Sequence, residues 1–236
     1  MSLLTHKLRV VLFLVFSLLS ATNFAQSSYF NIGFNVGNLG NGANSLKNEI
    51  TLYNRVKYVG SDNPIENPSF VRGVNFDIQL GGEDAKSFYV FWNWSNRHVI
   101  AKGSGIDPLT AQNVDFSFKY RHNNLNIAAF GFRFTDNFGI AYSPVDIGKL
   151  KVLLKTNDGK YDDFYNVEKG LLSSYTVYGS SYYLDYFINN KINIRLGYYK
   201  SWGGVDLRDQ EDVLTVHHYN ANRFTLAINY KIGLND

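Results

Sequence analysis

Apolar and polar residues alternate along most of this chain, most clearly in residues 223–232. There every second residue is apolar, and the residues between them are polar or small. A period of two gives a β-strand one apolar face and one polar face. The segment is about as long as the ~9–11 residues that a tilted strand needs to cross a bilayer. The pattern therefore predicts a membrane-spanning strand.

Similar alternating segments recur upstream. They cover residues 29–37, 70–80, 88–95, 114–121, 128–134, 175–187 and 192–199. Polar or glycine-rich stretches separate them, with short turns expected at 81–86, 122–124 and 189–190 and long loops at 38–68, 98–112, 143–172 and 203–220. Short turns on one rim and long loops on the other are typical of outer-membrane barrels. The sequence predicts an all-β, antiparallel transmembrane barrel of eight strands.

Two segments leave alternatives open. Residues 136–139 read either as a hairpin turn or as a bulge in one long strand, and ten strands result if residues 138–157 add a pair. Residues 45–58 fit a helical face and an interrupted strand, and we favour a short helix in the first long loop.

Residues 1–25 have the features of a signal peptide. Lys7 and Arg9 precede an apolar run over residues 10–19, and Ala25 is a small residue at the expected cleavage site. The run is too short for a transmembrane helix. We therefore expect residues 26–236 to form one exported domain, without disulfides because the chain contains no cysteine.

Composition narrows the function classes. Of the 23 Lys and Arg residues, two leave with the signal, so 21 remain against 20 Asp and Glu. This near balance argues against nucleic acid as a partner. The 17 Tyr, 18 Phe and 3 Trp residues suit strands and the aromatic girdles of membrane barrels.

Alternation alone does not say which face meets lipid, since a soluble barrel points its apolar face inward. Here the apolar faces carry almost no charge, while the opposite faces mix Gly, Asn, Ser and Tyr with charges of both signs. Aromatic residues also lie toward strand ends, where girdles form. The predicted girdle consists of Trp92, Trp94, Tyr198 and Tyr230. The apolar face is therefore expected to face lipid.

Charged residues on the opposite faces are expected to line the lumen. The predicted network comprises Asp77, Asp115, Lys119, Arg121, Arg133, Asp185, Arg195, Arg223 and Lys231. Buried ions must be paired or hydrated, so we expect Arg121, Arg195 and Arg223 to bind Asp77, Asp115 or Asp185. An eight-stranded lumen is just filled by side chains, which predicts a sealed barrel. A narrow anion-preferring pore is the alternative.

Through its signal peptide, its repeated alternation and the closing strand 224–232, the chain resembles the small outer-membrane β-barrel proteins of Gram-negative bacteria. Its richness in Asn, Tyr and Phe resembles barrels of the Bacteroidota. The resemblance implies contact with outer-membrane lipid and lipopolysaccharide, and another envelope protein as a candidate partner. Such barrels usually end on an aromatic residue, whereas here residues 233–236 follow Ile232, so insertion must use Tyr230 or tolerate the tail.

His217 and His218 are the candidate catalytic residues. With Tyr219 and Asn220 they faintly resemble the His-Tyr-Ser-Asn stretch of outer-membrane lipid A deacylases, but Asn220 stands where the serine would be. Without that hydroxyl, acyl transfer has no attacking atom. No metal-ligand or cofactor-binding motif is present. We therefore expect a non-enzymatic barrel with a structural, adhesive or partner-scaffolding role, ahead of a pore and of a deacylase.

The first prediction concerns location. The protein should fractionate with the outer membrane and migrate differently on gels before and after heating, because a closed sheet has no edge at which to begin unfolding. Recovery in the soluble periplasmic fraction without detergent would contradict it.

Overall fold

The computed structural model describes residues 28–38, 70–106, 109–157, 159–163, 176–202, 205–208, 216–219 and 222–233. The predicted signal peptide, the segment 45–58 and the tail 234–236 lie outside these residues. The strands are β1 Ser28–Asn38, β2 Phe70–Gly81, β3 Ser87–Ile106, β4 Asn113–Asn126, β5 Ala129–Arg133, β6 Phe138–Thr156, β7 Asp162–Asp163, β8 Thr176–Phe187, β9 Ile192–Ser201, β10 Val205–Arg208, β11 Val216–Tyr219 and β12 Arg223–Gly233. No helix in this part of the chain is long and apolar enough to cross a membrane.

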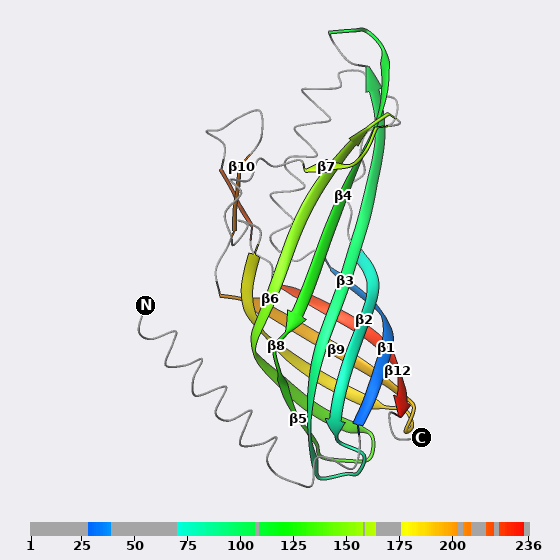
Figure 1. Ribbon diagram of the computed structural model, residues 1–236, viewed down its shortest axis with the longest axis vertical. Coiled ribbons are helices and arrows are strands. Elements are labelled where there is room, and N and C mark those ends of the chain that lie inside the picture. The colour runs from blue at the N-terminus through cyan, green and yellow to red at the C-terminus, as the bar shows by residue number, and fades with distance from the viewer. Residues whose placement is uncertain are drawn as a thin grey trace.

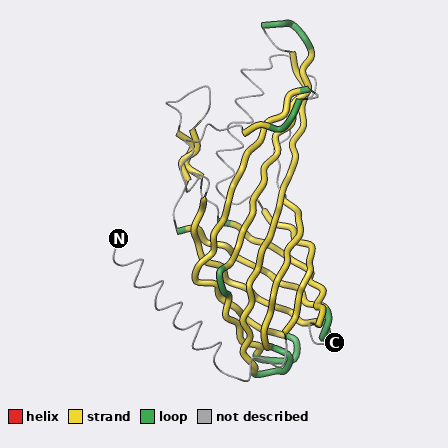
Figure 2. Tube along the Cα trace, in the orientation of Figure 1, coloured by secondary structure: helices red, strands yellow, loops and turns green. Residues whose placement is uncertain are grey.

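The main sheet closes into a barrel of eight antiparallel strands (Figures 1 and 2). The ring order is β1, β2, β3, β4 with β5, β6, β8, β9 and β12, and β12 pairs with β1. β4 and β5 act as one strand, because both pair with β3 on one side and with β6 on the other. The eight-stranded prediction is confirmed. The ten-stranded alternative is wrong, because β6 is a single strand and residues 134–137 form a turn.

The outer face of the barrel is apolar and the inner face is polar. On β12, Ile228 is 55% exposed while its neighbour Asn229 is 1% exposed, and Phe34 and Asn35 of β1 show the same contrast. Exposed apolar side chains around a closed ring with a buried polar interior are the arrangement of a transmembrane barrel. The lipid-facing assignment of β1, β2 and β12 agrees with the alternation in the sequence.

Two bulges at the same level interrupt the alternation. One lies at residues 127–128 between β4 and β5, and the other shifts the register of β6 between Ser143 and Asp146. They adjoin each other, because the Ile127 amide donates to the Val145 carbonyl at 3.1 Å. A bulge adds one residue to its strand, and a shift of one residue exchanges the two faces. Consequently the even-numbered residues of β4 point inward, and in β5 the odd-numbered residues point inward.

The bulges explain an error in the sequence prediction. Phe116, Phe118 and Tyr120 were expected to face lipid, yet each is only 3% exposed. The turn expected at 122–124 is also wrong, because β4 runs through these residues and buries His122 and Asn124. Polar residues here continue the strand because the barrel interior is itself polar.

Three strands continue past the barrel as an extension (Figure 1). Pairing of β3 with β2 ends at His98, and pairing of β6 with β8 ends at Lys149. Beyond these points β3, β4 and β6 pair with one another as far as Ile106 and Thr156, and β7 pairs with β6. At ~3.3 Å per residue, residues 99–106 add about 26 Å. The loops predicted at 98–112 and 143–172 are therefore partly strand.

The predicted loop 203–220 also contains structure, because β10 and β11 pair as a separate two-stranded ribbon. The short turns at 82–86, 134–137 and 188–191 share the rim at which β1 begins and β12 ends. The extension rises from the opposite rim. This distribution matches barrels with short periplasmic turns and longer extracellular segments.

A matched pair of isoleucines tests the lipid-facing assignment. Ile228 lies in the middle of β12 and Ile106 at the end of the extension, and they are 55% and 42% exposed. Ile228→Arg should lower the free energy of unfolding by ~2–4 kcal/mol in a bilayer, as expected for Arg at the midplane. Ile106→Arg should change it by less than ~0.5 kcal/mol, as on an exposed surface. Equal effects in urea titrations of the reconstituted barrel would refute the assignment.

Candidate functional site

One arginine joins three strands in the half of the lumen nearer the short turns. Arg195 of β9 contacts Asp185 of β8 through Nε at 2.6 Å and Asp77 of β2 through Nη1 at 2.7 Å. All three side chains are buried. Asp77 also accepts a hydrogen bond from the Asn93 amide, and Asp185 accepts one from the Tyr89 hydroxyl at 2.7 Å. Each of the three buried charges is thus paired with an opposite charge and hydrogen-bonded, as burial in a low dielectric requires.

Aromatic side chains fill the lumen around this ion triplet. The Arg195 guanidinium lies 3.8 Å from the centre of the Phe91 ring, a cation–π contact. Tyr89, Phe91 and Phe187 form a buried cluster with two alanines. Gly131 is required beneath this cluster, because a Cβ atom there would overlap the Tyr89 ring. In this half the lumen is therefore closed by side chains.

At the short-turn rim, two predicted lumen cations use other partners. Arg133 donates to the backbone carbonyls of Gly82, Glu83 and Asp136. Lys231 lies 4.1 Å from the centre of the Tyr29 ring. The rim is thus held by cation–carbonyl and cation–π contacts.

The other half of the lumen contains groups that the sequence reasoning missed. Asp146 follows the β6 bulge and accepts hydrogen bonds from the hydroxyls of Ser143 and Ser181. Arg223 Nη1 lies 2.8 Å from His122 Nε2, so this imidazole nitrogen must be the acceptor. Arg97 is also buried. The alternation along β3 could have predicted that Arg97 points inward. The bulge in β6 prevented the same prediction for Asp146.

The structure separates the nine predicted lumen charges into two groups. Asp77, Arg133, Asp185, Arg195, Arg223 and Lys231 lie on the inner face, and Asp115, Lys119 and Arg121 lie on the outer face of β4. Of the three arginines expected to bind aspartates, Arg195 makes the predicted contacts, with Asp77 and Asp185. The prediction is wrong for Arg121, which lies outside, and Arg223 contacts His122 and the Tyr199 ring instead of a carboxylate.

One outer residue of β4, Arg121, belongs to a basic row that crosses four neighbouring strands. In the pairing register Arg72 of β2 lies opposite His98 of β3, which lies opposite Arg121 of β4, which lies opposite Lys151 of β6. We call these four residues the basic row. Arg72 and His98 are exposed, and Arg121 and Lys151 are half-buried.

More cations surround the basic row. On the same outer face lie Lys102, Lys119, Lys149 and Lys155. Asp115 is the one carboxylate on this face among the described strand residues whose side chains are placed. Like charges directly opposite each other destabilise a sheet. The arrangement therefore favours an anionic partner outside the barrel.

The outer face changes character step by step along the strands. Two rows from the basic row toward the short turns, the paired residues are apolar. They are Phe76, Trp94, Leu125 and Ile147. The row between them contains Val74, Asn96, Asn123 and Lys149. Successive rows are ~7 Å apart, since each step is two residues. The surface thus passes from apolar through amide to cationic within about 14 Å.

The predicted girdle residues all lie on the outer face. Trp94 and Tyr230 are exposed, and Trp92 and Tyr198 are half-buried. Trp94 stacks on Phe76 with ring centres 5.5 Å apart, and Tyr198 packs against Phe224 at 4.8 Å. Their location at a membrane interface stays a prediction.

The two histidines proposed as catalytic lie in β11. His217 is opposite Leu207 and His218 is opposite Asp206 of β10, and only their backbone is described. Within the described residues, no three His, Asp or Glu side chains gather where they could hold a metal ion. The deacylase hypothesis gains no support from this geometry.

Substituting alanine for an inner and an outer arginine tests the lumen network. Arg195→Ala leaves Asp77 and Asp185 buried without their cation and should lower the free energy of unfolding by ~3–5 kcal/mol. Arg121→Ala should change it by less than ~0.5 kcal/mol in detergent. Neither variant nor the original protein should conduct a steady current in planar bilayers, because the aromatic cluster remains. A stable chloride-preferring conductance would contradict the sealed lumen.

No family model and no curated protein matches this chain. Solved structures with a similar fold include Ail, the attachment invasion locus protein of Yersinia pestis, in complex with the heparin analogue sucrose octasulfate. It is 14% identical with a TM-score of 0.40, covering 87% of this chain and 98% of that chain. Neisserial surface protein A is 10% identical (TM-score 0.37; 87% and 96%). OprG of Pseudomonas aeruginosa is also 10% identical (TM-score 0.36; 87% and 96%). The likeness is distant, and no ligand or activity of those proteins is transferred to this chain.

Proposed function

We propose that this protein is a sealed, non-enzymatic barrel of the outer membrane that holds its three-stranded extension at the cell surface as a scaffold. The basic row carries the proposal: it lies at the base of the extension, two rows beyond the apolar row of Phe76, Trp94, Leu125 and Ile147. Its partner is the phosphate-bearing headgroup region of lipopolysaccharide in the outer leaflet.

The position of the basic row supports a lipid headgroup as partner. Side chains two rows away, toward the short turns, are apolar and suited to hydrocarbon, which supports a position of the basic row near the polar headgroups. Arginine binds phosphate with two parallel hydrogen bonds, and lysine binds it as a point charge. Four adjacent strands therefore present phosphate-binding groups at one level.

The charge of this surface supports the same partner. Repulsion between Arg121 and Lys151, which lie directly opposite each other, is relieved when an anion lies between the side chains. A basic residue near an anionic membrane surface contributes ~1 kcal/mol to binding. A row of lipid phosphates along these four strands would thus stabilise the base of the extension.

The extension itself supports a scaffolding role. On its inner face the aromatic residues Phe116 and Phe118 lie opposite Gly103 and Ala101, which lets large and small side chains interdigitate. This packing makes the extension a paired sheet and not a set of separate loops. A sheet that projects about 26 Å beyond the barrel provides strand faces and edges for an envelope protein or a surface ligand.

The lumen argues against transport as the main function. Inner side chains of the described strands leave a cavity of about 30 Å³, too small for a continuous water column. A pore would require the ion triplet of Asp77, Asp185 and Arg195 to come apart, which buried charges resist.

A charge-neutralising pair of substitutions tests the lipid assignment. Arg121→Gln with Lys151→Gln should remove about 2 kcal/mol of the stabilisation that lipopolysaccharide bilayers provide over phosphatidylcholine bilayers. Unfolding of the reconstituted barrel in urea measures this difference.

The matched control neutralises charge at the opposite rim. Lys191 is exposed in the turn between β8 and β9, so Lys191→Gln should keep the full lipopolysaccharide effect. If the double variant responds to lipopolysaccharide as the unchanged barrel does, the basic row does not bind the headgroups.

A further inference from the structure

Two buried arginines in the half of the lumen nearer the extension have hydrogen-bond donors without a partner. Arg97 is 6% exposed and donates Nη2 to Ser95 Oγ at 2.9 Å, but its Nε and Nη1 have no partner among the described residues. Arg223 is 3% exposed and uses Nη1 toward His122, leaving Nε and Nη2 unpaired within the same part of the chain. Buried donors without acceptors are costly, so these four groups require an acceptor.

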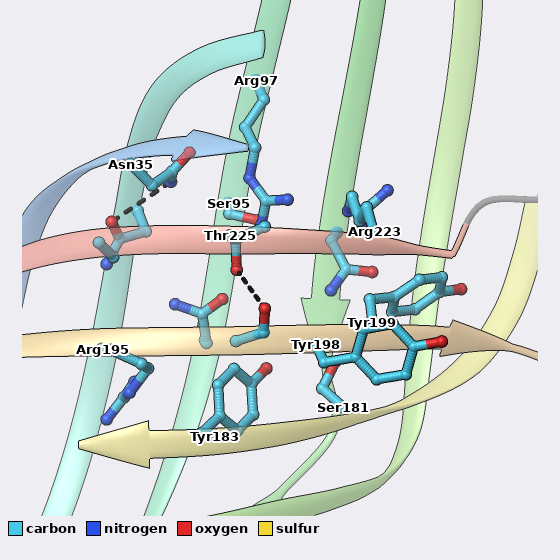
Figure 3. Close-up of a pocket in the computed structure, with 15 residues that line it drawn as sticks. Asn35, Ser95, Arg97, Ser181, Tyr183, Arg195, Tyr198, Tyr199, Arg223 and Thr225 are labelled. Atoms are coloured by element: carbon cyan, nitrogen blue, oxygen red, sulfur yellow. Dashed lines mark hydrogen bonds between the residues drawn. The ribbon is translucent and has the colours of Figure 1, made fainter. Parts of the chain in front are cut away.

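Both arginines line one cavity of about 30 Å³ (Figure 3). Arg97 reaches it from β3 and Arg223 from β12, while Arg195 and Tyr183 lie on the other side of the view. About 10–15 Å³ of such space accommodates one water-sized particle. The cavity therefore has room for about two.

Charge in this half of the lumen is unbalanced. Arg195 also lines the cavity, but its charge is matched by Asp77 and Asp185. Of the described carboxylates, Asp146 is buried next to the cavity, since Ser181 both lines the cavity and donates a hydrogen bond to Asp146. Asp146 neutralises one of the two guanidinium groups of Arg97 and Arg223. Among the described residues one positive charge remains, and water cannot neutralise it.

We propose that this cavity binds one small monovalent anion, chloride in the cell envelope, through the free N–H groups of Arg97 and Arg223. A single chloride brings the charge of this half to zero and accepts hydrogen bonds from both guanidinium groups. Asn35 and Asn124 also line the cavity. Sulfate carries one charge too many.

Refolding without halide tests the site. The full chain is refolded from urea into detergent in sodium gluconate, whose anion is too bulky for the cavity, and sodium chloride or bromide then replaces gluconate at constant ionic strength. The unfolding temperature should rise saturably, by roughly 5–10 °C when halide is about 100 times its dissociation constant. A general salt effect would not saturate in this exchange.

Two variants connect the response to the cavity. Arg97→Gln removes one guanidinium group and should abolish the halide response. Lys231→Gln removes another lumen cation, one that does not line the cavity, and should retain the response. Equal unfolding temperatures in gluconate and chloride, or loss of the response in Lys231→Gln alone, would overturn the proposal.

Crystals of the unchanged protein grown in bromide provide a test that needs no variant. An anomalous peak within hydrogen-bond distance of the Arg97 and Arg223 guanidinium groups supports the site, even if Arg97→Gln fails to fold. Absence of that peak at saturating bromide would mean that water alone fills the cavity, and the proposal would be wrong. Neither result depends on whether the basic row binds lipopolysaccharide.

Discussion

Backbone hydrogen bonding in lipid is the constraint on which the rest of this structure depends. Hydrocarbon provides no water to an unpaired N–H or C=O group, so a spanning sheet must close on itself. Pairing of β1 with β12 from Tyr29 to Gly37 makes that closure. Residues far apart in the chain thereby become neighbours, and every spanning strand gains a partner on both sides.

Closure with eight strands produces a narrow interior, and this sets the chemistry of the inner face. Side chains there are shielded from water, so each charge requires a partner at short range. Arg195 meets the requirement with two aspartates and an aromatic ring. Arg97 and Arg223 have no carboxylate contact among the described residues. The same narrowness that seals the barrel therefore generates the proposed anion site.

The adjoining bulges in β4/β5 and β6 connect the barrel to its proposed function. Each bulge exchanges the inner and outer faces of its strand. Above them, Phe116 and Phe118 pack inward in the extension, while Arg121 and Lys151 point outward into the basic row. Without this exchange, the cations of β4 would enter the lumen and its aromatic residues would face out. Two local insertions thus create both the packed extension and the cationic surface at its base.

The sequence by itself determined the barrel and the faces of β1, β2, β9 and β12, because alternation within a strand is local and survives any arrangement of its neighbours. It left eight and ten strands open, and only the pairing of β6 as one strand decided for eight. It also placed Asp77, Asp185 and Arg195 on the inner face. Only the tertiary structure decided which of them meet, since Arg195 and Asp77 are 118 residues apart and their contact depends on strand stagger. The faces of β4 were likewise beyond the sequence. Alternation distinguishes two faces of a strand but does not say which face is inside. A bulge exchanges the inner and outer faces, and no residue type in the sequence identifies where the bulge lies.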